Sequence, residues 1–234
     1  MTSPADALRR GSDAAVCVSV CRQTIGLVET AFAARRAEGA AVACAPGCSF
    51  CCHQRVGVYA HEAIALLGHL RARMPRAAFA AVETRILATA RAVDRMTAVQ
   101  HRAANMRCAL LIEGRCAAYD ARPLACARYH SLSRARCASA FEHPQDLGTP
   151  RNSRPALAQL EAFADALTTA TEAALAASGL SASKGELHQT LRALLERPNL
   201  VEQWGAGEDI ALSCTTNDAR DTALHADRAL DARG

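Results

Sequence analysis

Apolar residues recur every three or four positions along most of the chain, which is the spacing that gathers side chains on one face of an α-helix. Over residues 12–39 this face consists of Ile25, Val28 and Phe32, and Gly39 can end the helix. The pattern therefore predicts a first helix over these residues, with its apolar stripe turned toward a core.

Two further stripes follow. One predicts a helix over residues 59–74 that stops before Pro75, because proline has no N–H with which to continue the helix. The other predicts a long helix over residues 76–105. The apolar residues of the two stripes are Ile64, Leu67, Leu70 and Met74, and then Phe79, Val82, Ile86, Val93 and Met96.

A second helical part is expected from about residue 153. Its first helix has Leu157, Leu160, Ala164 and Leu167 on one face. Ser183 and Glu186 have the spacing of a capping box, in which each side chain pairs with the other's backbone N–H. The helix that they predict has an inner face of Leu187, Leu191, Leu194 and Leu195.

Residues 108–137 lack the helical spacing. Short apolar runs flank the turn candidate Glu113-Gly114, which predicts a short β-hairpin near 109–119. The expected fold class is mainly α, a small helical domain with two irregular cysteine-rich segments and a C-terminal helical extension. The expected parts are a cysteine-cluster domain at 1–145, the extension at 146–214 and a loose polar tail at 215–234.

Composition narrows the class of protein. Half of the 234 residues are apolar, which argues against disorder, and the net charge of +4 makes no case for nucleic acid. Residues 1–150 carry a net +8 and residues 151–234 a net −4, which we interpret as solvated helical surface. A protein partner for the basic part or for the extension stays open. No uninterrupted apolar run approaches a membrane span and no signal peptide is evident, so we expect a cytoplasmic protein without membrane contact.

Eleven cysteines in a cytoplasmic chain indicate metal rather than disulfides, because thiols stay reduced there. Three of them have the C-x3-C-x2-C spacing of radical-SAM enzymes, but the adjacent Cys52 does not fit that pattern. The chain also lacks the strand–helix alternation of a barrel. Eight cysteines form two segments of four, which are Cys44, Cys48, Cys51 and Cys52, and then Cys108, Cys116, Cys126 and Cys137.

One tetrahedral ion or one cubane needs only four thiolates. Eight therefore predict either two sites or one site with additional thiols. We expect the three other cysteines, Cys17, Cys21 and Cys214, to be small buried apolar residues.

The two segments together resemble the YkgJ-like CxxCxxCC family of cysteine-cluster domains. The matching pattern is C-x3-C-x2-C-C at 44–52, followed by C-x7-C-x2-Y-x2-R-P-x2-C at 108–126. The resemblance covers residues 40–140 and implies zinc, iron or an iron–sulfur cluster held by the eight cysteines. Family members commonly carry arginine directly after the cysteine that follows Arg-Pro, whereas this chain has Ala127 and then Arg128.

Three polar residues are candidates for contact with the bound group. Arg122 can hydrogen-bond cluster sulfurs and offset their charge, Tyr119 can pack against the site, and Arg128 is the candidate for the family's arginine. The expected function is redox sensing, metal handling or electron transfer. Two alternatives stay open: an enzyme such as a protein methylase using S-adenosylmethionine, because flagellin lysine methylases carry a similar signature, and a purely structural zinc domain.

Overall fold

The computed structural model describes residues 14–45, 47–146 and 155–210. Within these ranges the protein is mainly helical with two small two-stranded sheets, which confirms the expected fold class. Two sequence predictions lie outside the described residues, namely the tail 215–234 and Cys214.

Long helices alternate with short irregular segments along the chain. The first elements are α2 (Ala14–Ala37), η1 (Phe50–His53), β1 (Gly57–Tyr59), α3 (Ala60–Arg73), α4 (Arg76–Val93) and α5 (Ala98–Ala103). They are followed by β2 (Leu111–Ile112), β3 (Arg115–Cys116), η2 (Tyr119–Ala121), α6 (Leu124–Ala127) and α7 (Arg134–Glu142). The C-terminal part consists of α8 (Ala158–Ala177), β4 (Lys184–Glu186), α9 (Leu187–Glu196) and α10 (Leu200–Gly205).

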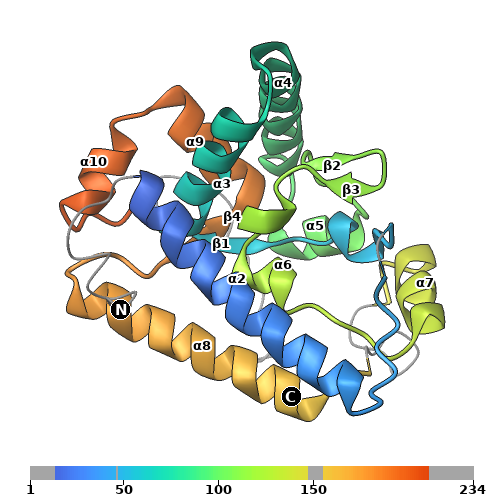
Figure 1. Cartoon of the computed structure of the whole chain (residues 1–234). Helices are drawn as coiled ribbons and strands as arrows, with labels where there is room; N and C mark the ends of the chain where they lie inside the picture. The colour runs from blue at the N-terminus through green and yellow to red at the C-terminus, as the bar shows by residue number, and fades with distance from the viewer. Residues whose placement is uncertain (1–13, 46, 147–154, 211–234) are drawn as a thin grey trace, which may run out of the picture.

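Helix α2 crosses the molecule and contacts both α3 and α8 (Figure 1). Its predicted stripe of Ile25, Val28 and Phe32 is buried, with no side chain more than 8% exposed. Within α2, Val16–Ala37 is long and apolar enough to cross a membrane, a property that core helices of soluble proteins share. The helix ends before Gly39, whose φ of 89° is one that glycine adopts readily.

The single helix predicted over residues 76–105 is wrong, because two helices occupy this stretch. Helix α4 ends at Val93 and α5 begins only at Ala98. The Thr97 hydroxyl accepts the Gln100 N–H at 3.1 Å, and the Gln100 side chain accepts the Thr97 N–H at 2.9 Å. This capping box satisfies two backbone donors at a new helix start, so the chain begins a second helix there.

The two sheets differ in how far apart their strands lie in the sequence. Strands β2 and β3 form the predicted hairpin, and both Glu113 and Gly114 at its turn have positive φ, as a tight hairpin turn requires. Strand β1 pairs with β4 of the extension in antiparallel register, with Gly57 opposite Glu186. The second pairing ties the extension to the chain just after the first cysteine segment.

The helix predicted near residue 183 exists as α9, but its predicted capping box is wrong. Glu186 is itself the N-cap, and its side chain accepts the Gln189 N–H at 2.9 Å. Ser183 instead donates its hydroxyl to Asp209 at 2.5 Å. The reason is that residues 184–186 are held extended as β4, so the helix can start only after them.

One cluster of buried side chains contains residues from both the cysteine-bearing half and the extension. Trp204 of α10 is fully buried in it, together with Leu66 of α3. The predicted stripes contribute eight more of its members, which are Ile64, Leu67, Leu70, Val82, Ile86, Leu187, Leu191 and Leu194. Leu160 of α8 packs in a smaller cluster against α2. The division at residue 145 stays a prediction, although the main core spans it.

Candidate metal centre

The two cysteine segments meet through their backbones. Cys51 and Cys52 lie in the 3-10 helix η1, whereas Cys48 precedes it, so the three do not share one helical face. The Cys108 N–H donates to the Cys52 carbonyl oxygen at 2.8 Å. This hydrogen bond joins the end of the first segment to the start of the second, across more than fifty residues of sequence.

Helix α7 brings the last cysteine of the set toward the first segment. Its N-cap is Ser133, whose hydroxyl accepts the Arg136 N–H, and Cys137 follows one turn later. Phe141 at the other end of α7 packs on Phe50, with ring centroids 5.6 Å apart, and on His53 at 5.0 Å. These aromatic contacts hold α7 against η1.

The Cys44 thiol interacts with three other thiols. Burial raises its pKa, a hydrogen bond with the Ser131 backbone lowers it, and the neighbouring Cys51, Cys137 and Cys48 raise it further. The last three effects place these thiols within electrostatic reach of Cys44. Four of the eight predicted ligands therefore form one neighbourhood.

A second neighbourhood contains the same Cys51. A hydrogen bond with Cys52 and burial together raise the pKa of Cys51 strongly. Burial, Cys108 and Cys51 raise the pKa of Cys116 to about 11, although a backbone hydrogen bond at Ala118 lowers it. Burial raises the pKa of Cys126, and Cys108, Cys116 and Cys51 add to the effect. Thiols of both segments thus lie within electrostatic reach of Cys51.

The donor set fits zinc or iron, which thiolates bind well. No disulfide joins the ten described cysteines. Across residues 14–45, 47–146 and 155–210, no three Cys, His, Asp or Glu side chains already have the arrangement of an ion site. The side chains would therefore have to turn toward an ion to bind it. The raised pKa values of Cys44, Cys51, Cys116 and Cys126 favour the neutral form of these four thiols in the absence of a cation.

Arg122 lies near two of the predicted thiol ligands. Its positive charge lowers the pKa of Cys51 and of Cys116, which places the guanidinium within electrostatic reach of both. The same group donates to the Tyr119 carbonyl oxygen at 2.8 Å, stacks on the Tyr119 ring at 3.8 Å and pairs with Glu29. Tyr119 is 56% exposed, so it covers the arginine from the solvent side.

Arg128 faces helix α8. Its guanidinium pairs with Glu161 at 3.1 Å and with Asp165 at 2.7 Å. This contact attaches the second cysteine segment to the extension.

Two of the cysteines outside the segments lie in the core, as expected. Cys17 is fully buried and Cys21 is 5% exposed, both on α2. Burial raises the pKa of Cys21 well above its usual value, and the Glu62 charge adds to this.

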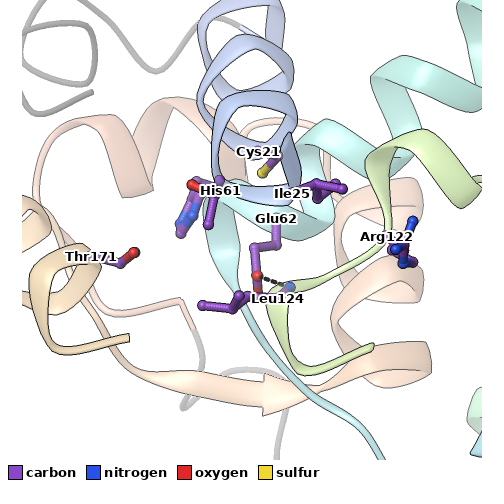
Figure 2. A pocket seen from close by; sticks show the side chains of 8 residues that line it. Cys21, Ile25, His61, Glu62, Arg122, Leu124 and Thr171 are labelled. Atoms are coloured by element: carbon purple, nitrogen blue, oxygen red, sulfur yellow. Dashed lines mark hydrogen bonds between the residues drawn. The ribbon is translucent and has the colours of Figure 1, made fainter. Parts of the chain in front are cut away.

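Glu62 is a buried carboxylate that fixes the second segment. It lies in a small pocket between α2, α3 and the Arg-Pro stretch, together with Cys21, His61 and Arg122 (Figure 2). One oxygen accepts the Leu124 N–H at 2.7 Å and the other accepts the Tyr59 N–H at 3.0 Å. Burial raises its pKa, while these two hydrogen bonds lower it.

Replacing Glu62 by alanine should lower the free energy of unfolding by about 1–3 kcal/mol, because two buried N–H groups lose their acceptor. Glu62→Gln should cost less, since it keeps one acceptor and removes a buried charge. Chemical denaturation followed by circular dichroism measures both. Glu38→Ala on the surface is the control and should cost less than about 1 kcal/mol. Equal stability of Glu62→Ala and the control would contradict the capping role.

Sequence patterns gave no sign of a buried Glu186–His188 pair that contacts the second segment. His188 Nδ1 lies 3.0 Å from Glu186 Oε1, and its Nε2 accepts the Ala109 N–H at 3.2 Å. Burial lowers the pKa of His188, but hydrogen bonds with Cys108 and Glu186 outweigh it and raise the pKa to about 10. Nε2 can accept the Ala109 N–H only while it carries no proton, so this hydrogen bond belongs to the neutral ring, whose Nδ1 donates to Glu186.

Comparison with known proteins gives one match. Residues 43–146 match the family model CxxCxxCC, described as "Putative zinc- or iron-chelating domain". This range contains all eight predicted cysteines together with Tyr119, Arg122 and Arg128. No curated protein and no solved structure gave a significant match.

Proposed function

We propose that the protein is a cytoplasmic metal carrier or redox protein that holds zinc or iron through both cysteine segments, which lie within the residues 43–146 that match the CxxCxxCC family model. The observation that carries this is the contact between the two segments, where the Cys108 N–H donates to the Cys52 carbonyl oxygen at 2.8 Å and thiols of both segments lie within electrostatic reach of Cys51. The family model describes chelation of zinc or iron, and the thiol grouping supports that chemistry in this chain.

We infer a centre with more than four sulfur ligands. One neighbourhood contains Cys44, Cys48, Cys51 and Cys137. The other contains Cys51, Cys108, Cys116 and Cys126. Each has the four thiolates that a tetrahedral zinc or iron ion needs, and Cys51, hydrogen-bonded to Cys52, lies where they meet.

The residues around the thiols serve this centre by controlling charge and position. Bound zinc or iron would supply positive charge that stabilises the thiolates. Arg122 offsets part of the remaining negative charge, because its charge already favours the thiolates of Cys51 and Cys116. Helix α7 and the Cys108–Cys52 hydrogen bond keep the two sets of sulfurs together.

Elemental analysis of anaerobically purified protein, with acid-labile sulfide measured in parallel, tests the proposal. We expect zinc or iron at more than one ion per chain. Iron with sulfide would identify a cluster and a redox function, whereas zinc without visible absorbance would favour the structural alternative. Protein that retains neither metal after purification, and takes up neither on addition, would refute the proposed function.

A further inference from the structure

The Glu186–His188 pair lies forty residues beyond the family-matched range, yet it contacts a predicted metal ligand. We propose that His188, oriented by Glu186, is a positioning residue for the Cys108 sulfur, so that the C-terminal extension is part of the metal centre. The inference rests on the proposed function, because it concerns how one thiolate of that centre is held.

The pair is buried and its geometry is fixed at both ends of the imidazole. Glu186 is 1% exposed and His188 is 3% exposed. On one side Nδ1 meets the Glu186 carboxylate at 3.0 Å. On the other side Nε2 accepts the N–H of Ala109 at 3.2 Å, and the ring lies within hydrogen-bonding reach of the Cys108 side chain. The ring therefore faces the peptide that links Cys108 to Ala109.

Cys108 lies at the junction of the two cysteine segments, so a contact that fixes its position affects both segments. Its N–H binds the Cys52 carbonyl oxygen, and its side chain influences both Cys116 and Cys126. A shift of Cys108 would move one sulfur of the second neighbourhood relative to the first segment. A side chain that fixes Cys108 thus fixes the junction between the two segments.

The extension holds the pair in place through three attachments. Strand β4, which ends at Glu186, pairs with β1, and the Leu187 N–H donates to the Val56 carbonyl oxygen at 2.9 Å. The other Glu186 oxygen caps α9 at the Gln189 N–H, and the Gln189 side chain donates to Asp94 of α4 at 2.8 Å. The imidazole therefore lies at the junction of β4 and α9, and hydrogen bonds attach both elements to the rest of the protein.

Groups that hydrogen-bond metal ligands from behind orient those ligands, and their loss typically lowers metal affinity by about 10–100-fold. Here the histidine acts on Cys108 through the peptide that follows it, because Nε2 accepts the Ala109 N–H. Asparagine at position 188 can keep the contact with Glu186 but is too short to reach Ala109 and Cys108. Glutamine is long enough to place an acceptor near the position of Nε2.

The test compares His188→Asn with His188→Gln in the full chain, using Co²⁺ as a spectroscopic probe. We expect His188→Asn to weaken Co²⁺ binding by about 10–100-fold and His188→Gln to weaken it less. Both should keep the wavelengths of the sulfur-to-cobalt bands, because the ligands are unchanged. His69→Asn, at another buried histidine (8% exposed) on α3, is the control and should bind Co²⁺ as the wild type does.

A second readout needs no metal. In metal-free protein we expect His188→Asn to change the rate of Cys108 alkylation by iodoacetamide severalfold, with Cys137 in the same digest as the internal reference. Unchanged Cys108 alkylation, unchanged Co²⁺ affinity, or a shift of the cobalt bands that makes His188 itself a ligand would each overturn the inference. Wild-type protein that takes up no Co²⁺, Zn²⁺ or Fe²⁺ would instead refute the proposed function, and its metal role for His188 with it.

Discussion

Serine in place of Cys51 should remove most of the bound metal, because this thiol lies where the two neighbourhoods meet. A serine hydroxyl is a poor ligand for zinc and iron and leaves each set of four sulfurs one short. The loss in affinity should exceed the roughly 10–100-fold that substitutions behind a metal site cause. Metal content per chain after gel filtration in the presence of a weak chelator measures it.

Cys126→Ser provides the comparison within the same centre. Among the thiols that influence the pKa of Cys126 are Cys108, Cys116 and Cys51, whereas Cys44, Cys48 and Cys137 are not among them. We therefore expect Cys126→Ser to lose only part of the metal if two ions are bound, and all of it if one cluster uses both segments. Cys17→Ala, a buried cysteine on α2, is the control and should keep the wild-type metal content. Full metal retention in Cys51→Ser would contradict the arrangement around that residue.

Local patterns predicted the helices and the hairpin well because both depend on nearby residues. A stripe such as Ile25, Val28 and Phe32 is buried whichever helix lies opposite it, and the Glu113-Gly114 turn needs no distant partner. The break at Thr97 was also local, since the Thr97–Gln100 capping box is visible in the sequence. The apolar stripe continues past the end of α4 to Met96, so periodicity alone predicts one long helix where two occur.

Contacts between distant segments could not be predicted in this way. Strand β1 has only three residues and pairs with β4 more than 120 residues later, so neither strand has an alternating pattern long enough to recognise. The contact of His188 with Cys108 depends on that pairing. Arg128 likewise finds Glu161 and Asp165 only because α8 packs beside the second cysteine segment.

The cysteine segments were recognisable because their spacing is specific, yet the sequence could not show which sulfurs are neighbours. Cys44 and Cys137 are more than ninety residues apart, and the docking of α7 on η1 brings them together. Likewise, Arg122 lies near Cys51 because Glu62 accepts the Leu124 N–H and so holds the chain that follows Arg122 and Pro123 in place.

The core that the cysteine-bearing half shares with the extension leads to the second prediction with a large effect. Trp204 is the only tryptophan, is fully buried, and donates its indole N–H to the Ser181 carbonyl oxygen at 3.1 Å. Trp204→Ala should lower the free energy of unfolding by about 3–5 kcal/mol, because it leaves a large cavity in the core that both halves share. Denaturant titration followed by circular dichroism measures this at fixed metal loading.

Trp204→Phe and Leu27→Ala separate the cavity from other effects. Phenylalanine fills most of the space and should cost less than alanine, whereas Leu27 is 51% exposed and its loss should change stability little. If the extension and the cysteine-bearing half share one core, Trp204→Ala should still unfold in a single transition at lower denaturant and lose its metal in that transition. Two separate transitions, with metal retained through the first, would show that the cysteine-bearing half folds without α10, and the support we assign to the extension would then be wrong.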